Sequence, residues 1–190
     1  MSETLSNYEK ILSENESLNT ERLTLRWFLE SDISDVFEYA SDEEVVKFLS
    51  WPPHSNIEHT KKRFPDLFLR KPGMFAIVLK EGDKCIGCID IRIDALNDKG
   101  SFGYVLNKKY WNKGYMTEAL KKILDFSFNV LKLNRVEATH YTVNEQSGKV
   151  MAKCGMKNEG LGFQEVKIKG KYMDVVHFGI LKDTWKSHSI

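Results

Sequence analysis

Hydrophobic residues recur three and four positions apart between residues 116 and 131, which is the clearest periodic pattern in the chain. Lysine, aspartate and asparagine side chains fill the opposite positions. This spacing places one hydrophobic stripe along a helix, so it predicts an amphipathic helix packed against a core. Residues 101–106 read as a strand, and Gly114 marks a tight turn between strand and helix. The pattern therefore predicts a strand, a turn and a helix in close succession.

Patterns of the same kind place further elements on both sides of this unit. We expect Ser31 to cap the first helix, a pair of prolines after Trp51 to end the second, and Gly155 to end the last. In chain order the additional elements are a strand at 22–28, helices at 33–40, 43–49 and 56–70, a hairpin of 75–80 and 85–93, a strand at 135–143, a helix at 147–154 and a hairpin of 165–168 and 172–181.

This order of elements predicts an α+β fold of mixed α/β layers. We expect a single domain over residues 20–185 and a C-terminal tail over residues 186–190. Residues 1–19 form an N-terminal arm, for which a short docked helix and a loose segment are both open. At 190 residues the chain is long enough to bury a substantial core.

Charge and composition exclude several classes of protein. The chain has 28 basic and 27 acidic side chains, a net charge of +1, which does not suggest a dedicated nucleic-acid binder. No apolar run approaches the roughly 18 to 20 residues of a membrane span. The N-terminal residues resemble neither a signal peptide nor a transit peptide, so we expect a cytoplasmic protein that contacts neither membrane nor nucleic acid.

The cysteines and histidines do not indicate a metal or disulfide site. An odd count of three cysteines argues against a disulfide framework. Cys85 and Cys88 lie three apart in a predicted strand and would point to opposite faces, so we expect them to be packing residues rather than a redox or zinc motif. The five histidines are dispersed, and no pair has metal-ligand spacing. We therefore predict no metal.

The strand, turn and helix over residues 103–120 favour a phosphate-bearing ligand. The first N–H groups of a helix lack intrahelical partners and lie at the positive end of its dipole, where phosphate binds. The alternative is a plain connection in which Gly114 only permits the turn, and Tyr110 and Trp111 pack into the core.

Three stretches share motifs with one known family. The chain resembles the GNAT N-acetyltransferases, in the branch that contains the ribosomal-protein N-terminal acetyltransferases. The first stretch combines Gly103-Tyr104 with Tyr110-Trp111-Asn112-Lys113-Gly114-Tyr115-Met116-Thr117-Glu118-Ala119. The others are Glu21-Arg22-Leu23-Thr24-Leu25-Arg26 and a downstream set made of Asn144, Ser147, Lys153, Gly155, Met156, Glu159 and Gly160. The resemblance covers residues 20–185 and implies a mostly antiparallel, twisted central sheet with helices on both faces.

The resemblance implies acetyl-CoA as co-substrate and names the residues that would hold it. The pyrophosphate would lie on main-chain N–H groups of the turn, at Lys113, Gly114, Tyr115, Met116 and Thr117. Met116 departs from the family, which carries Gly or Ala there, and its side chain would crowd the phosphates. The strand ending at Val105 and Leu106 would part from the next strand and pair with the pantetheine amides.

The same resemblance implies the residues near the thioester. Asn144 would hydrogen-bond the cofactor, and Ser147 would donate a proton or hydrogen bond to the departing thiolate. The alternatives are a turn role for Asn144 and a helix cap for Ser147. For the general base, Glu165 lies beside the family's position, and Asp90 sits within an otherwise apolar strand.

Two hypotheses for function remain open at this point. The first is transfer of acetyl from acetyl-CoA to a primary amine by direct attack, the acceptor being a protein N-terminus, such as that of a ribosomal protein, or a small-molecule amine or antibiotic. The second is a non-catalytic acyl-CoA-binding module, motivated by Met116 and by the lack of an evident base. Trp51 either lines the acceptor pocket or fills its loop. A homodimer is compatible with both hypotheses.

Overall fold

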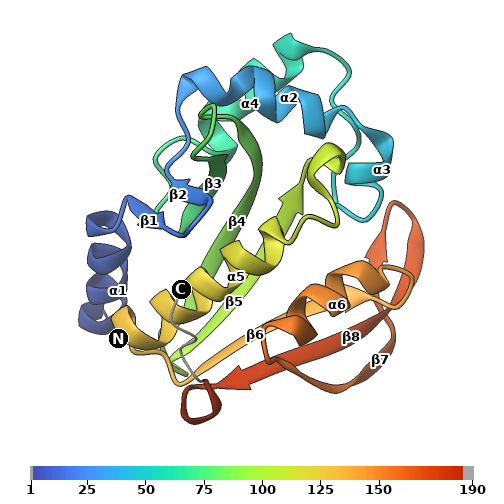
Figure 1. The fold of residues 1–190 in the computed structure, drawn as a ribbon. Coiled ribbons are helices and arrows are strands. Elements are labelled where there is room, and N and C mark those ends of the chain that lie inside the picture. The colour runs from blue at the N-terminus through green and yellow to red at the C-terminus, as the bar shows by residue number, and fades with distance from the viewer. Residues whose placement is uncertain (1, 186–190) are drawn as a thin grey trace.

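The computed structural model describes residues 2–185, which form one mixed sheet of eight strands with helices on both faces (Figure 1). The strand order is β1-β2-β3-β4-β5-β6-β8-β7. Every neighbouring pair is antiparallel except β5 and β6, which are parallel. The predicted α+β fold with a mostly antiparallel sheet is confirmed. The strands are β1 (Ser17–Asn19), β2 (Leu23–Arg26), β3 (Met74–Leu79), β4 (Cys85–Asp94), β5 (Lys99–Leu106), β6 (Arg135–Tyr141), β7 (Lys157–Ile168) and β8 (Lys171–Leu181).

Two hydrophobic clusters divide the helices between the faces of the sheet. One face is covered by α1 (Ser2–Glu14), α5 (Tyr115–Asp125) and α6 (Glu145–Lys153), and the other by α2 (Ile33–Ala40), α3 (Glu43–Val46) and α4 (Ile57–Leu67). Side chains alternate along β3, where Phe75 and Ile77 pack toward the first set and Ala76 and Val78 toward the second. No helix among residues 2–185 is both long and apolar enough to cross a membrane.

Five local predictions need correction. Helix α3 ends at Val46, before Trp51, so the pair of prolines does not end it. Ser31 does not cap α2: it lies inside a 3-10 turn (Glu30–Asp32), and the Asp32 carboxylate accepts the Leu29 N–H at 2.8 Å. The predicted helix over 116–131 changes to a π-helix (Phe126–Val130) after α5, with Leu131 N–H bonded to the Phe126 carbonyl five residues back.

The final hairpin is longer than predicted, since β7 starts at Lys157 rather than at residue 165. Gly160 and the irregular register between Gly162 and Val166 hide its strand pattern. Cys85 and Cys88 do not face opposite sides. Strand β4 has a bulge of one extra residue opposite Ile77 and Val78 of β3. Both thiols therefore pack against the cluster under α2.

The described part of the N-terminal segment packs on the sheet. Tyr8 and Leu12 of α1 are buried, and the Tyr8 hydroxyl donates to Asp98 at 2.8 Å. Strand β1 pairs with β2. Short 3-10 turns follow β5 (Lys108–Tyr110) and β8 (Lys182–Thr184). The division into an arm and one domain stays a prediction, and the predicted tail at 186–190 lies outside the described residues.

Glu38 of α2 joins the turn before β4 to the segment after β5. Its carboxylate lies 2.7 Å from Lys109 Nζ and 2.9 Å from Lys84 Nζ. Hydrogen bonds from Lys109 and Lys84 lower the pKa of Glu38 to about 2. This contact fixes α2 against the end of β5, next to the cleft described below.

We expect Glu38→Gln to reduce the free energy of unfolding at neutral pH by about 1–2 kcal/mol, after allowance for the solvent exposure of the pair. A carboxylate with a lowered pKa in the fold stabilises it above its ordinary pKa. The wild-type advantage should therefore shrink as pH falls from about 5 to about 2. Urea unfolding of both proteins across this range measures it; a difference that does not depend on pH would contradict the ion-pair origin.

Candidate active site

The sheet opens between its two parallel strands. β5 pairs with β6 only at its first three residues, with Lys99 opposite Arg135, Gly100 opposite Val136 and Ser101 opposite Glu137. β5 continues to Leu106 and β6 to Tyr141 without further pairing, and Figure 1 shows the two strands diverging. The space between them is a cleft of about 1210 Å³, lined by β5, the start of α5, the end of β6 and α6. The predicted separation of the strands is confirmed.

The alternation of β5 decides which main-chain groups face this cleft. Asn107 N–H donates to the Ile86 carbonyl on β4 at 2.8 Å, so Val105, two residues away, also directs its main chain to β4. Leu106 and Tyr104 direct theirs to the open side. The Leu106 carbonyl accepts the Trp111 indole N–H at 2.7 Å, as this direction requires. Leu106 therefore fits the predicted pantetheine contact, whereas Val105 reaches the cleft with its side chain only.

The turn before α5 has a backbone suited to an anion. Asn112 has φ +61° and Gly114 φ +81°, and Gly114 occupies the N-cap position of the helix. Left-handed residues next to a helix start curl successive N–H groups toward one point, which creates an anion-binding concavity. Four of the five predicted turn residues line the cleft, namely Gly114, Tyr115, Met116 and Thr117. Lys113 is not among the lining residues, and its ammonium lies 5.3 Å from the Tyr110 ring centre.

The Met116 side chain does not obstruct this turn. Met116 is 5% exposed and packs in the core with Ala119 and Leu120. The group that would bind a phosphate is the main-chain N–H of Met116, which any residue type supplies. The side chain would interfere only if it pointed toward the phosphate. The expected crowding at Met116 is therefore not present.

The charged residues around the cleft favour a polyanion. Its lining includes two carboxylates, Glu44 and Glu145, and four cationic side chains: Lys47, Arg92, Lys149 and Lys153. Four positive against two negative charges leave a net +2 on the lining. A field of this sign attracts phosphate groups.

Ser147 and Asn144 lie together at the start of α6. Asn144 is at the N-cap position, without a capping side-chain bond, and its side chain lines the cleft. The Ser147 hydroxyl lies 2.8 Å from the Tyr104 hydroxyl, and Tyr104 also donates to the Ser147 carbonyl at 2.9 Å. Burial raises the pKa of Tyr104, so this phenol stays protonated. Ser147 is thus tied across the cleft to β5 and is not the cap of α6.

The two candidate bases lie far apart. Asp90 is on β4 opposite Gly103, on the face covered by α2, and accepts the Gly103 N–H at 3.2 Å. Burial raises the pKa of Asp90, and the Arg92 charge opposes this only in part. Glu165 is on β7, where its carboxylate lies 2.7 Å from His177 Nε2. Four strand spacings of about 4.8 Å, on the order of 19 Å, separate β4 from β7, so one acceptor nitrogen cannot contact both.

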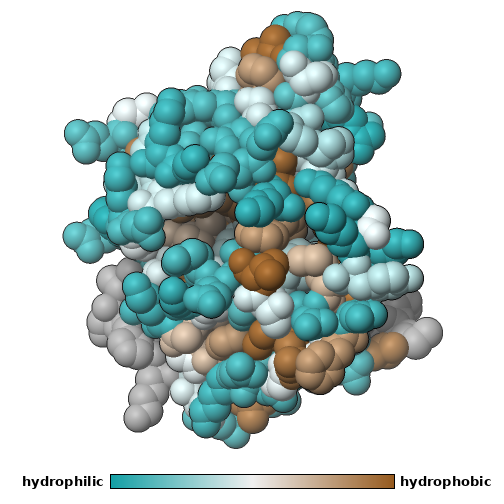
Figure 2. Space-filling view, turned by 90° about the vertical axis from the view of Figure 1, so that its right-hand side faces the viewer, coloured by the Kyte–Doolittle hydropathy of each residue, from teal (hydrophilic) through white to brown (hydrophobic). Residues whose placement is uncertain are grey.

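The acceptor side of the cleft is walled by α3, the residues after it and β6. Phe48 and Tyr141 face each other with ring centres 6.4 Å apart. Lys169, at the turn between β7 and β8, donates to the Val46 carbonyl at 2.9 Å and so joins the last hairpin to α3. Figure 2 views this side and shows hydrophobic residues in its middle between hydrophilic ones. Trp51 packs against His54 and the cluster under α2 and is not part of the lining.

Several residues of the site were not predicted as such. Tyr104, Arg92 and Phe48 line the cleft, and Arg22, which precedes β2, contacts the turn. Tyr104 and Arg22 belong to stretches that carried the resemblance, which was the available signal. Among residues 2–185, no three His, Cys, Asp or Glu side chains lie close enough together to hold a metal ion.

A parallel strand pair that separates beside a helix start suited to an anion is the arrangement that the sequence resemblance implies for an acetyl-CoA-dependent transferase. The acetyltransferase (GNAT) domain family matches residues 22–157, and the chain belongs to this family. The uncharacterized N-acetyltransferase p20 of Bacillus licheniformis is 36% identical over 172 residues, which are 88% of this chain and 97% of that protein. The ribosomal protein uS5-alanine N-acetyltransferase of Escherichia coli (strain K12) is 25% identical over 183 residues, covering 88% and 92%.

A solved structure agrees with the relatives. The crystal structure of a GNAT-family acetyltransferase from Bacillus anthracis has a TM-score of 0.80 at 29% identity and covers 88% of this chain and 99% of that one. The chain is an N-acetyltransferase, and its family takes acetyl-CoA as co-substrate. The cleft fits this co-substrate, since it joins a turn suited to an anion to the main chain of Leu106, which faces the open side of β5.

Proposed function

We propose that this N-acetyltransferase acetylates the α-amino group at the N-terminus of a protein. The observation that carries the proposal is the charge of the acceptor side. Glu44 is its one carboxylate among the lining residues, and it is paired with Lys108 at 3.3 Å. Of the cations there, Arg92 is paired with Asp90 at 3.1 Å, and Lys47 adds positive charge. A polyamine or aminoglycoside carries several positive charges and requires acidic partners. A peptide N-terminus carries one amine and needs no such set of acidic partners, and the Phe48 and Tyr141 rings offer it an aromatic wall.

The chemistry of the amine supports the same acceptor. An α-amino group has a pKa near 7.7 to 8.0 and is partly neutral at cellular pH, whereas a lysine amine near 10.4 is almost wholly protonated. A neutral amine attacks the thioester carbonyl, the C–N bond forms, and the C–S bond then breaks. The nitrogen loses one proton, and the CoA thiolate gains one. Positioning supplies much of the rate of such a reaction. The E. coli relative named as acting on a ribosomal-protein alanine agrees with this acceptor class.

The acceptor is tested by measuring thiol release from acetyl-CoA with three kinds of amine. The panel contains peptides with N-terminal Ala or Ser, the same peptides with blocked N-termini and an internal lysine, and polyamines with an aminoglycoside. We expect turnover with the free N-termini only, with the acetyl group located there by mass spectrometry. A higher kcat/KM for a polyamine would contradict the proposal. CoA binding without turnover on any amine would favour the non-catalytic module instead.

Asp90 is the better placed of the two candidate bases, because it lies on β4 beside the strand that borders the cleft. We expect Asp90→Asn to lower kcat by about tenfold, less than the range for a full general base, since the α-amine is partly neutral. Activity that needs the Asp90 carboxylate is lost as pH falls through its raised pKa, so the acidic limb of the kcat profile should disappear in the variant.

Glu165→Gln is the matched comparison, since it removes the same charge from the carboxylate that His177 holds. We expect an unchanged acidic limb in that variant. A loss of the limb in Glu165→Gln and not in Asp90→Asn would transfer the role of base to Glu165.

A further inference from the structure

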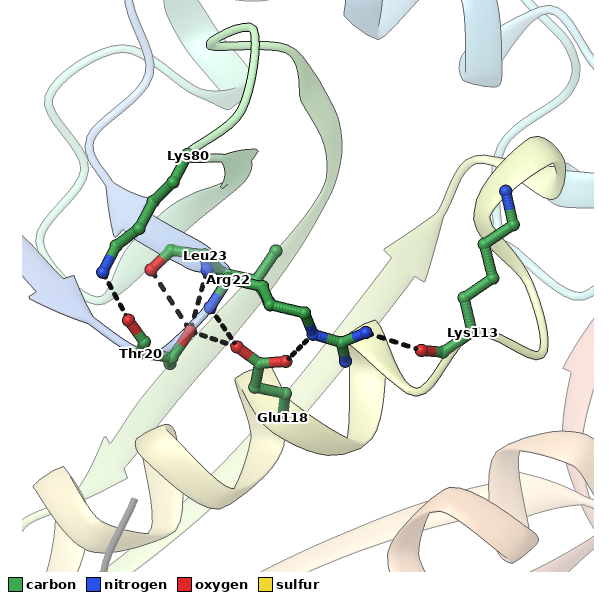
Figure 3. A network of polar contacts seen from close by, with 6 residues as sticks. All are labelled: Thr20, Arg22, Leu23, Lys80, Lys113 and Glu118. Carbon is green, nitrogen blue, oxygen red and sulfur yellow. Dashed lines mark hydrogen bonds and ion pairs between the residues drawn. The ribbon is translucent and has the colours of Figure 1, made fainter.

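Arg22, immediately before β2, reaches across to α5 and contacts both sides of the turn at 112–117 (Figure 3). Its Nε donates to Glu118 at 2.7 Å and its Nη1 to the Lys113 carbonyl at 3.1 Å. The guanidinium lies 4.4 Å from the centre of the Tyr115 ring. A side chain at Gly114 would meet Nη2 at 3.4 Å, so the guanidinium also lies against the glycine. One side chain thus touches residues on both sides of the left-handed position.

Glu118 is the second member of this contact. Its Oε1 accepts the Thr20 hydroxyl at 2.6 Å and the Arg22 N–H at 2.8 Å. Thr20 is itself fixed, because its hydroxyl also accepts the Leu23 N–H at 2.9 Å. Burial alone would raise the pKa of Glu118, but the bonds from Thr20 and Arg22 outweigh it and lower the pKa. The carboxylate is therefore ionised and anchored to the start of β2.

The charge of Glu118 needs this neutralisation. The residue lies in the first turn of α5, close to the N–H groups that would bind the pyrophosphate. An unpaired Glu118 carboxylate would repel a phosphate bound at the helix start. Because the Glu118 side chain is largely buried, salt would screen this repulsion only weakly. Arg22 cancels that charge and leaves the positive helix end available to a ligand.

We propose that Arg22 and Glu118 are a positioning pair that holds the turn at 112–117 in the conformation that binds the CoA pyrophosphate. The proposal rests on the use of acetyl-CoA by this chain and is independent of which amine is acetylated. It makes the segment at 20–22, far from the thioester, a determinant of affinity for the phosphate part of CoA. Neither residue contacts the acetyl group or the amine in this scheme.

The test compares two acetyl donors that share the thioester arm. Acetyl-CoA carries the pyrophosphate and adenosine, and acetyl-pantetheine lacks them. We expect Arg22→Met to lower kcat/KM for acetyl-CoA about tenfold through KM, with kcat and the kcat/KM for acetyl-pantetheine unchanged. Arg22→Lys, which keeps the charge without the planar fork, should lie between Arg22→Met and wild type. Arg63→Met, which removes an exposed charge from α4, should match wild type with both donors.

A double variant separates charge from shape. Arg22→Met with Glu118→Gln removes both charges, so we expect it to regain part of the affinity that Arg22→Met loses. Equal losses with both donors, or an unchanged KM for acetyl-CoA in Arg22→Met, would overturn the proposal. If the wild-type protein binds CoA but acetylates no amine, the proposed function fails. Titration calorimetry of wild type and Arg22→Met with CoA and with pantetheine then still tests the role of Arg22.

Discussion

Gly114→Pro is expected to abolish measurable binding of acetyl-CoA. Gly114 has φ +81°, and proline is restricted to about −65°, so the turn cannot keep its shape. Proline also removes one of the N–H groups at the start of α5. Displacing several charge-assisted donors at once costs a few kcal/mol, which corresponds to a loss of about 100-fold or more in affinity. Calorimetric titration with CoA, at a temperature where the variant is folded by circular dichroism, measures this loss.

Gly82→Pro provides the matched control for this experiment. Gly82 also has φ +81°, in the turn between β3 and β4, and no other atom lies within 4 Å of the position its side chain would take. It therefore meets the same backbone conflict outside the cleft. We expect lower thermal stability and unchanged CoA affinity in Gly82→Pro. Wild-type affinity in Gly114→Pro would remove the turn from the CoA site.

The sequence predicted the features that depend on local signals. The hydrophobic repeat before Leu131 located α5, and Gly114 located the turn before it, because periodicity and a positive φ leave marks within a few residues. The shared motifs then gave the separation of β5 from β6, which no local pattern encodes.

The residues that sequence reasoning missed or misplaced depend on contacts between distant segments. Tyr104 meets Ser147 across 43 residues, and Arg22 meets Glu118 across 96. Val105 was expected to offer its main chain to the cofactor, but its pairing with Cys88 on β4 directs those groups away from the cleft. A single bulge in β4 put both cysteines on one face. Such details depend on strand register and bulges, because a shift of one residue moves a side chain to the other face of the sheet.

Ser147→Ala is expected to lower kcat about 100-fold, the lower end of the range for general-acid catalysis, with little change in CoA affinity. The hydroxyl lies at the start of α6 beside the cleft, where it can donate to the thiolate as the C–S bond breaks. The single Tyr104 phenol hydrogen has two acceptors within reach, the Ser147 carbonyl at 2.9 Å and Ser147 Oγ at 2.8 Å. When it turns from the carbonyl to Oγ, the serine hydrogen is left free for the sulfur and is a stronger donor. Rapid-quench measurement of the acetyl-transfer step with a peptide acceptor follows the loss.

Tyr104→Phe tests whether the tyrosine acts through the serine. The phenylalanine keeps the stack on Phe102, whose ring centre is 5.9 Å away, and removes only the hydroxyl. We expect a fall in kcat of about tenfold and a loss of stability of about 1 kcal/mol. The double variant should be no slower than Ser147→Ala alone, because both changes remove one chain of hydrogen bonds. If the losses in kcat of the two single variants add in the double variant, Tyr104 does not act through Ser147. Ser147→Thr retains a hydroxyl and should keep most of the wild-type rate. Wild-type turnover in Ser147→Ala would mean that Ser147 only joins α6 to β5.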